Sequence, residues 1–332
     1  MKKPVISFVV IGRNEGERLT RCLKSIREIR GIDGEVEVIY VDSASTDDSV
    51  QRAQALGTRV LEVRPERPSA ALGRNAGWKE AHASFILFLD GDTILHPDFP
   101  ARALAAMQDS SVAVVWGHRR EIQTGASVFN RVLDLDWIYP AGLSEFCGGD
   151  ALMRRAVLED VGGFDDTLIA GEEPELCQRI RGKGLWILHL DVPMTGHDLA
   201  MTQWSQYWRR AVRAGHAYAE VSDRTAGGPY PLWEDDSRRN VRRGAVLLAL
   251  IIGGPVVSLL LQNWMPLAAT IVLLAGLVLR TAWKARWKSG DWVTLLLYGV
   301  HSHLQQLPIL FGQLGYWRDR RRGRRRGLIE YK

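Results

Sequence analysis

The stretch Phe85-Ile86-Leu87-Phe88-Leu89-Asp90-Gly91-Asp92-Thr93 places five apolar residues directly before two acids that flank a glycine. The apolar run is short and shows no polar alternation. It therefore predicts a strand buried on both faces, as in a parallel sheet covered by helices. Open α/β sheets bind ligands at the carboxyl ends of their strands, which is where Asp90 and Asp92 fall.

The two acids indicate a metal site. Two carboxylates in a small space need a cation or protons to offset their repulsion. Hard oxygen ligands with room for phosphates suit Mg²⁺ or Mn²⁺. The simpler alternative is a helix cap, in which Asp92 or Thr93 accepts bonds from the backbone amides that follow.

Two more apolar runs, residues 5–11 and 36–41, each end in a polar loop. A helical pattern lies between them, and residues 59–63 predict another strand. Alternating strands and helices predict an α/β fold with a doubly wound, mostly parallel sheet. The polar loops then share one edge of that sheet, as a ligand site requires.

Six short motifs occur in order along residues 4–220 of the chain. They are Val9-Val10-Ile11-Gly12-Arg13-Asn14-Glu15, Val41-Asp42-Ser43-Ala44-Ser45-Thr46-Asp47, Gly73-Arg74-Asn75-Ala76-Gly77, Asp90-Gly91-Asp92, Gly148-Gly149-Asp150 with Gly162-Gly163-Phe164-Asp165, and Gly171-Glu172-Glu173-Pro174-Glu175-Leu176. Together they resemble the family 2 inverting glycosyltransferases of GT-A fold.

The resemblance implies roles for individual residues. Asp42 matches the acid that bonds the nucleotide base, although an aspartate in a turn is the plain alternative. Arg74 matches a basic residue near the base and diphosphate, the alternative being a surface arginine. The full set implied for donor binding is Ile11, Arg13, Glu15, Asp42, Arg74, Asp90 and Gly91. The implied ligands of a divalent cation, Mg²⁺ or Mn²⁺, are Asp92, Asp90 and His197.

Glu173 matches the catalytic base of the family. The family more often has Gly-Glu-Asp where this chain has Gly171-Glu172-Glu173, so either Glu172 or Glu173 can hold the role. Inversion needs an anion that removes the proton of the acceptor hydroxyl. The alternative is an acidic first helical turn, which the helix dipole favours.

Composition sets wider limits. The chain has 332 residues, a net charge of +5 and three isolated cysteines, which fit a reducing compartment. Its first residues lead straight into a strand-like run, so no cleavable signal peptide is expected. The segment Gln203-Trp204-Ser205-Gln206-Tyr207-Trp208-Arg209-Arg210 matches the motif of processive synthases only loosely. Arg209, Arg210 and Arg213 could contact an anionic acceptor or form a basic helix face near a membrane.

Beyond residue 240 the chain becomes apolar. Two apolar segments, at about residues 244–262 and 265–280, are long enough, or nearly so, to span a bilayer. Basic residues flank both outer ends and none lies in the link between them, so the pair predicts a hairpin with cytoplasmic ends. The alternative is a buried helical pair in a soluble domain.

Residues of about 292–317 are also apolar, but their histidines and glutamines would be costly in hydrocarbon. We expect an interfacial helix on the cytoplasmic leaflet. The arginine-rich residues 318–332 then form a cytoplasmic tail that binds anionic lipid. A nucleic-acid tail is the rival, but no nucleic-acid partner is expected beside a membrane hairpin.

The expected domains are therefore a GT-A domain over 1–225, a linker and basic collar over 226–243, a membrane region over 244–317 and the tail. The expected function is transfer of a sugar from a nucleotide-diphosphate donor to a hydroxyl of a lipid or lipid-linked glycan. Such an enzyme would be a multi-pass protein at the cytoplasmic face of the cell membrane, acting in cell-envelope or exopolysaccharide synthesis. A polyprenyl-phosphate transferase and a non-catalytic nucleotide-sugar scaffold are the alternatives.

Overall fold

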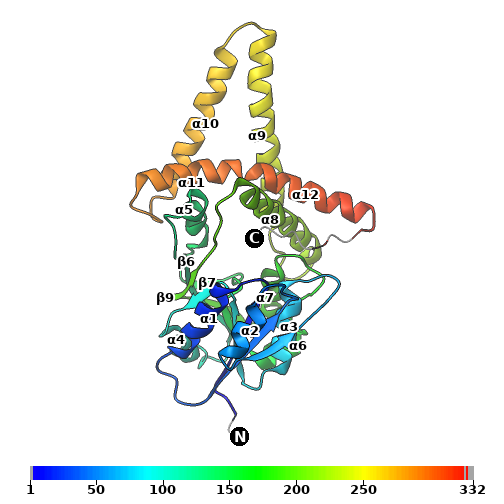
Figure 1. The fold of residues 1–332 in the computed structure, drawn as a ribbon. Helices are drawn as coiled ribbons and strands as arrows, with labels where there is room; N and C mark the ends of the chain where they lie inside the picture. The colour runs from blue at the N-terminus through cyan, green and yellow to red at the C-terminus, as the bar shows by residue number, and fades with distance from the viewer. Residues whose placement is uncertain (1–2, 325–326, 328–332) are drawn as a thin grey trace. The chain divides into compact units, whose positions relative to one another are not determined.

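A computed structural model describes residues 3–324 and 327 of the chain (Figure 1). By their contacts they form two units. Unit 1 comprises Met1–Ile122, Tyr139–Leu199 and Thr225–Leu232, and unit 2 comprises Gln123–Ile138, Ala200–Arg224 and Trp233–Lys332. The expected boundary at residue 225 thus differs from the observed division, because residues 123–138 and 200–224 group with the C-terminal helices.

In the described part of unit 1, nine strands form one sheet in the order β3-β2-β1-β4-β8-β6-β9-β5, with β7 pairing with β9. The strands are β1 (Ile6–Gly12), β2 (Val36–Asp42), β3 (Arg59–Glu62), β4 (Phe85–Asp90), β5 (Thr93–Leu95), β6 (Val112–Glu121), β7 (Gly142–Ser144), β8 (Ala151–Arg154) and β9 (Trp186–His197). The helices are α1 (Glu17–Arg27), α2 (Ser49–Ala55), α3 (Ala70–Glu80), α4 (Phe99–Ala106), α6 (Arg155–Val161) and α7 (Glu172–Gly182).

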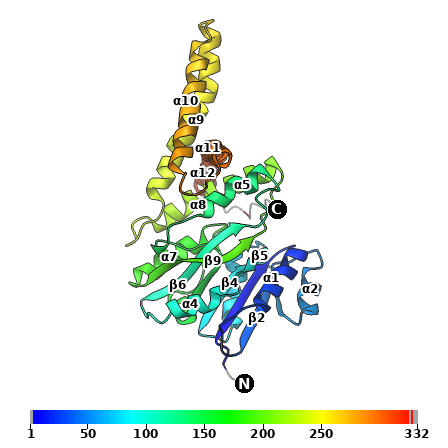
Figure 2. The ribbon, with the colours of Figure 1, turned by 90° about the vertical axis from the view of Figure 1, so that its left-hand side faces the viewer.

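The expected α/β architecture is confirmed. β1 pairs in parallel with β2 and β4, and β2 pairs in parallel with β3, as the alternating pattern predicts. Beyond β4 the sheet is mixed, because β8 runs antiparallel to both β4 and β6. Figure 2 shows this sheet with α1 and α2 near its N-terminal strands.

The core of unit 1 explains why β4 has no polar alternation. The side chains of Ile86, Leu87, Phe88 and Leu89 are fully buried, since helices cover both faces of this central strand. Helix α3 packs closely on β1. A Cβ at Gly77 would lie 2.3 Å from the Cγ1 atom of Val9, so the helix can approach the strand only with glycine there.

Unit 2 is helical in its described residues. Its elements are α5 (Val128–Asp134), the 3₁₀ helix η1 (Leu135–Trp137), α8 (Trp204–Thr225), α9 (Glu234–Leu260), α10 (Met265–Lys284), α11 (Trp292–Leu304) and α12 (Gln306–Arg321). α9 and α10 lie side by side as a hairpin, and α11 and α12 run across its direction (Figure 1). Helices α9 and α10 are long and apolar enough to cross a membrane, with mean hydropathies of 2.0 and 1.8 over their most apolar windows.

Glycines bring the helices of unit 2 into backbone contact. A Cβ at Gly215 of α8 would lie 2.1 Å from the carbonyl oxygen of Ile309, and one at Gly312 of α12 would lie 2.1 Å from that of Val212. A Cβ at Gly244 of α9 would likewise lie 2.7 Å from the carbonyl oxygen of Gln306. Small residues at helix crossings are typical of helices that pack in membranes.

Two expectations for this region need correction. Residues 234–243, which include the basic collar, are not linker but the first turns of α9. Residues 292–317 form two helices rather than one, with a break at Gln305. Pro308 has no N–H for the carbonyl of Leu304 and crowds it sterically, so a single continuous helix is disfavoured. Arg325 and Arg326 of the expected tail lie outside the described residues.

Candidate active site

The loop after β4 is held by backbone bonds. The N–H of Gly91 donates to the carbonyl of Ile11 at 2.8 Å, and the Thr93 hydroxyl donates to the carbonyl of Asp90 at 2.8 Å. A Cβ at Gly91 would lie 3.1 Å from the Ile11 carbonyl oxygen, so a larger residue would press on β1. Ile11 therefore serves this site through its backbone, which fixes the positions of Asp90 and Asp92.

Arg74 is the centre of the site. Its side chain is 2 % exposed and pairs with three carboxylates from two other elements. Its Nη2 donates to Asp90 at 2.9 Å, and its Nη1 lies 2.8 Å from Glu172 and 2.9 Å from Glu173. The structure thus places Arg74 among buried acids rather than on an exposed helix face. A buried guanidinium needs such partners, because unpaired charge is costly away from water.

Glycine at position 149 makes room for this cluster. A Cβ there would lie 2.6 Å from Nη2 of Arg74 and 3.0 Å from Oδ2 of Asp90. The next residue, Asp150, is 1 % exposed and accepts from the N–H of Asp90 at 2.9 Å and from the hydroxyl of Thr195 at 2.8 Å. Burial raises the pKa of Asp150. In the motif Gly148-Gly149-Asp150, Gly149 thus leaves space for the Asp90 carboxylate and Asp150 accepts from the Asp90 backbone.

Glu172 and Glu173 both lie in the first turn of α7, after Gly171 in the left-handed conformation. The Glu173 side chain is 14 % exposed and that of Glu172 is 5 % exposed, so Glu173 is the more accessible of the two. Burial and the neighbouring Glu172 raise the pKa of Glu173 to about 7, although Arg74 acts in the opposite direction. A carboxylate with this pKa suits a proton acceptor that works near neutral pH.

Asp92 and His197 lie together. β5 and β9 are antiparallel and pair Thr93 with His197, so the adjacent Asp92 lies beside the imidazole. The Nε2 atom of His197 is 3.2 Å from Oδ2 of Asp92, and both residues are nearly buried. Burial, followed by the positive charge of Arg119, lowers the pKa of His197 to about 4. The imidazole is therefore neutral near pH 7.

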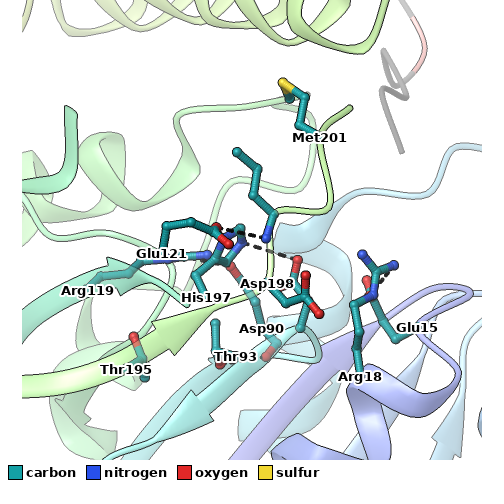
Figure 3. Close-up of polar contacts among 12 residues, drawn as sticks. Glu15, Arg18, Asp90, Thr93, Arg119, Glu121, Thr195, His197, Asp198 and Met201 are labelled. Atoms are coloured by element: carbon teal, nitrogen blue, oxygen red, sulfur yellow. Dashed lines mark hydrogen bonds and ion pairs between the residues drawn. The ribbon is translucent and has the colours of Figure 1, made fainter. Parts of the chain in front are cut away.

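A neutral imidazole next to a carboxylate is a pair that can ligate a divalent cation. Glu121 of β6 lies on the other side of the ring, with its Oε2 atom 3.6 Å from Nδ1 of His197. Figure 3 shows Glu121, Arg119 and His197 at this end of the sheet with Asp90. Within residues 3–324 and 327, no group of three or more His, Cys, Asp or Glu side chains is arranged to hold a metal ion. Asp92 and His197 nevertheless present one carboxylate and one neutral imidazole side by side, which are donor types that suit a divalent cation.

Asp42 is 1 % exposed, at the end of β2. It accepts bonds from the Tyr40 hydroxyl at 2.8 Å, and from the backbone N–H of Ser45 at 2.8 Å and its hydroxyl at 2.5 Å. The bonds to Ser45 are those of an aspartate in a turn, which is the alternative to a base-binding role that the sequence analysis left open. Glu15 forms an ion pair with Arg18 at 2.9 Å, and Arg13 is half-buried in the same loop.

Three functional candidates lack a clear signal in the sequence. Arg119 lies 3.4 Å from Asp90 and 3.7 Å from Asp150. Glu121 accepts from the N–H of Leu199 at 3.0 Å, and Asp198 forms an ion pair with Arg21. Strand pairing between β6 and β9 brings Arg119 and Glu121 to the site, so only the fold reveals them.

Residues 7–162 match the family model of Glycosyl transferase family 2. This chain has a family 2 glycosyltransferase domain. The family match, the α/β sheet and the order of the motifs agree, so the predicted resemblance of this domain and the predicted fold are confirmed.

Two relatives of the chain are named as glycosyltransferases. The chain is 24 % identical over 231 residues to the probable glycosyltransferase YdaM of Bacillus subtilis. This match covers 63 % of the chain and 54 % of YdaM. The chain is 26 % identical over 261 residues to the pre-mycofactocin glycosyltransferase of Mycobacterium tuberculosis, covering 74 % and 52 %. The chain thus spans about half the length of these relatives.

The fold also matches a solved structure, the mannosyltransferase PcManGT of Pyrobaculum calidifontis in complex with GDP-Man and Mn2+. The TM-score is 0.63 at 19 % identity, over 96 % of this chain and 88 % of the other. The likeness therefore concerns the fold of nearly the whole chain.

Replacing Arg74 by methionine tests its role as the centre of the cluster. The change leaves three carboxylates, of which Glu172 is buried, without their cation, so we expect a loss of about 3–5 kcal/mol in the apparent free energy of unfolding at pH 7. Burial already raises the pKa of Glu173 in the folded chain, and loss of the guanidinium, which acts in the opposite direction, would raise this pKa further. The deficit should then be small at pH 5, where Glu173 is protonated with or without Arg74, and grow as the pH rises.

The measurement is denaturant titration of the full chain in detergent at several pH values. Arg52→Met is a matched control, because Arg52 pairs with Asp48 and Glu17 on the surface, where solvent screens the charges, so this change should leave the stability nearly unaltered. Equal stability of the Arg74→Met and wild-type chains at pH 7 would contradict the assignment.

Proposed function

We propose that this chain is a metal-dependent inverting glycosyltransferase that moves a sugar from a nucleotide-diphosphate donor to a hydroxyl of a lipid or lipid-linked glycan. The observation that carries the proposal is Glu173. Its carboxylate is nearly buried, has a pKa of about 7, and shares Arg74 with Asp90, which follows the central strand.

In the proposed reaction Glu173 accepts the proton of the acceptor hydroxyl as its oxygen attacks the anomeric carbon. The new carbon–oxygen bond forms on the face opposite the leaving group, the bond to the diphosphate breaks, and the configuration inverts. Arg74 keeps Glu173 in place while Glu172, at 2.8 Å from the same guanidinium, takes up part of its charge. Glu173 thereby stays basic enough to remove a proton.

Asp92 and His197 are the proposed protein ligands of Mg²⁺ or Mn²⁺, with Asp90, whose carboxylate also pairs with Arg74 and Arg119, as the third. When bound, the cation offsets the negative charge that develops on the departing diphosphate. Asp90, Gly91, Asp42, Arg74 and the loop with Ile11, Arg13 and Glu15 remain the proposed donor-binding residues. In that set Arg74 would act by positioning Asp90 rather than by contacting the donor, since its guanidinium already pairs with Asp90 and the two glutamates.

The proposed location is the cytoplasmic face of the cell membrane. Two helices long and apolar enough to cross a bilayer support it, and their windows are only 11 % and 6 % buried by protein. Apolar side chains that remain exposed on such helices are readily explained by contact with lipid. A membrane-confined acceptor explains why a transferase domain would share a chain with this hairpin.

The first experiment is a donor screen. Purified chain is incubated with Mn²⁺ and a panel of nucleotide sugars, starting with GDP-mannose because PcManGT was solved with that donor, and nucleotide-diphosphate release is measured. Turnover supports an enzyme, whereas binding without turnover in the presence of membrane extract supports the scaffold alternative. A product linked through phosphate would support the polyprenyl-phosphate alternative.

Glu173→Gln should lower turnover by about 10²–10⁴-fold, the usual contribution of a general base, with little change in donor affinity. In the wild type, kcat/KM should rise with pH through about 7 and then level off, because Glu173 acts as a base only once it loses its proton. The variant should lose this rise. Steady-state kinetics from pH 5.5 to 8.5 provide the measurement.

Glu175→Gln is the control, since Glu175 lies in the same helical turn but pairs with Arg179. It removes the same charge near the helix end without touching the cluster. If Glu172→Gln loses turnover and Glu173→Gln does not, the two roles are exchanged. If neither does, the inverting mechanism proposed here is wrong.

Asp92→Asn should nearly abolish transfer and weaken Mn²⁺ binding at least about tenfold, because a carboxylate ligand becomes a neutral amide. Binding is measured directly from the electron paramagnetic resonance signal of free Mn²⁺ in the presence of GDP. Asp98→Asn serves as control, as Asp98 is exposed at the start of α4. Unchanged Mn²⁺ affinity in Asp92→Asn, or full wild-type activity in excess chelator, would rule out this metal site.

The ends of the hairpin should both be cytoplasmic. Basic residues precede the apolar part of α9 and follow that of α10, whereas the link Gln262-Asn263-Trp264 has none. A reporter that is active only in the cytoplasm should therefore work when fused after Lys332. Activity of a reporter that works only outside the cell would show that residues 292–317 together make a third crossing of the bilayer instead.

A further inference from the structure

The outer face of α8 carries aromatic and basic side chains that the proposed chemistry does not use. A hollow of about 590 Å³ lies on unit 2 and is lined by Trp204, Ser205, Trp208 and Arg209. Trp204 and Trp208 are four residues apart, as are Ser205 and Arg209, so the four side chains share one face of the helix. Trp204 is 46 % exposed, although a large apolar ring is normally covered.

The two indole rings form the apolar wall of the hollow. Their centroids are 5.9 Å apart, and Trp204 also stacks on Tyr207 at 5.1 Å. On the other side Trp208 contacts Phe311 of α12 at 5.9 Å. Phe311 is 47 % exposed, so an aromatic surface runs from α8 onto α12 without a polar covering.

Arg209 supplies the charge. Its Nε donates to the carbonyl of Ser205, one turn earlier on the same helix, at 3.3 Å. In the part of the chain that the structure describes, no carboxylate forms an ion pair with it. Arg209 lines the same hollow as the two indoles, and a planar guanidinium binds phosphate oxygens in pairs.

The rest of unit 2 indicates what covers this face. α8 and α12 are in backbone contact at Gly215 and Gly312, and α12 also packs on α9, the first helix of the apolar hairpin. Exposed side chains of α11 and α12 extend the apolar surface; they are Trp292, Val293, Leu296, Val300, Phe311 and Leu314. Tryptophan and arginine are the residues that concentrate where a bilayer meets water.

We propose that the hollow on α8 binds the phosphate headgroup of a lipid, with Arg209 pairing with the phosphate and Trp204 and Trp208 contacting the adjoining part of the lipid chain. A sugar ring would also stack on the indoles, but it would leave the guanidinium without an anion. A lipid phosphate satisfies both parts of the site at once. The bound lipid is the acceptor or its carrier, a step that rests on the proposed function.

The test uses the full chain in detergent, titrated with dioleoyl phosphatidic acid and, separately, with dioleoyl phosphatidylcholine, and bound lipid is counted by native mass spectrometry. We expect Arg209→Gln to weaken binding of phosphatidic acid at least about tenfold, the effect of losing one charge-assisted pair. Trp208→Leu, which keeps apolar character but removes the ring, should weaken it several-fold. Arg209→Lys should restore part of the affinity.

Arg238→Gln is the matched control, because it removes one exposed arginine from the same unit, outside both the hollow and the arginine-rich tail. Equal loss in Arg238→Gln and Arg209→Gln would overturn the proposal in favour of general charge attraction. Displacement of the lipid by millimolar inorganic phosphate would overturn it in favour of a free-phosphate site. Binding of a soluble oligosaccharide that depends on Trp208 but not on Arg209 would overturn it in favour of a sugar platform.

No donor or turnover enters this measurement. Failure of lipid binding with normal donor turnover would reject the hollow alone. Lipid binding without any turnover would instead reject the proposed function and leave the lipid site standing.

Discussion

One buried guanidinium organises unit 1. Arg74 of α3 contacts Asp90 at the end of β4 and two glutamates at the start of α7, so one cation connects two consecutive elements with a third that lies 98 positions further along the chain. Its surroundings must exclude water and leave no carboxylate unpaired. Gly149 is tied to the same requirement, because any Cβ there would occupy the position of the guanidinium. The charge of Arg74 therefore both connects the carboxylates of the site through ion pairs and opposes the rise in the pKa of Glu173.

Burial acts on the two halves of this site in opposite directions. It disfavours the charged form of every group, which raises the pKa of Glu173 to about 7 and lowers that of His197 to about 4. The acid thereby becomes a base of useful strength near neutral pH, and the imidazole becomes a neutral ligand. A single physical cause thus gives Glu173 and His197 different roles, with Arg74 near the first and Arg119 near the second.

Unit 2 is built on a different principle. Its helices meet through glycines and leave many apolar side chains exposed, as on Leu259 and Leu260 at 79 % and 76 %. Water offers such a surface no favourable partner, whereas a bilayer does. The tryptophans of α8 and the exposed apolar side chains of α11 and α12 would contact lipid for the same reason, at the proposed boundary between bilayer and water.

The sequence by itself determined the strand before Asp90, the order of the elements, the enzyme family and the two apolar helices. Each of these rests on local pattern or on motif order, which a chain carries along its length. The pairing of Asp92 with His197, the supporting places of Arg119 and Glu121, and the choice between a surface and a buried Arg74 were decided only by tertiary structure. Sheet register and burial create them, since they bring together residues up to about a hundred positions apart and remove water between them.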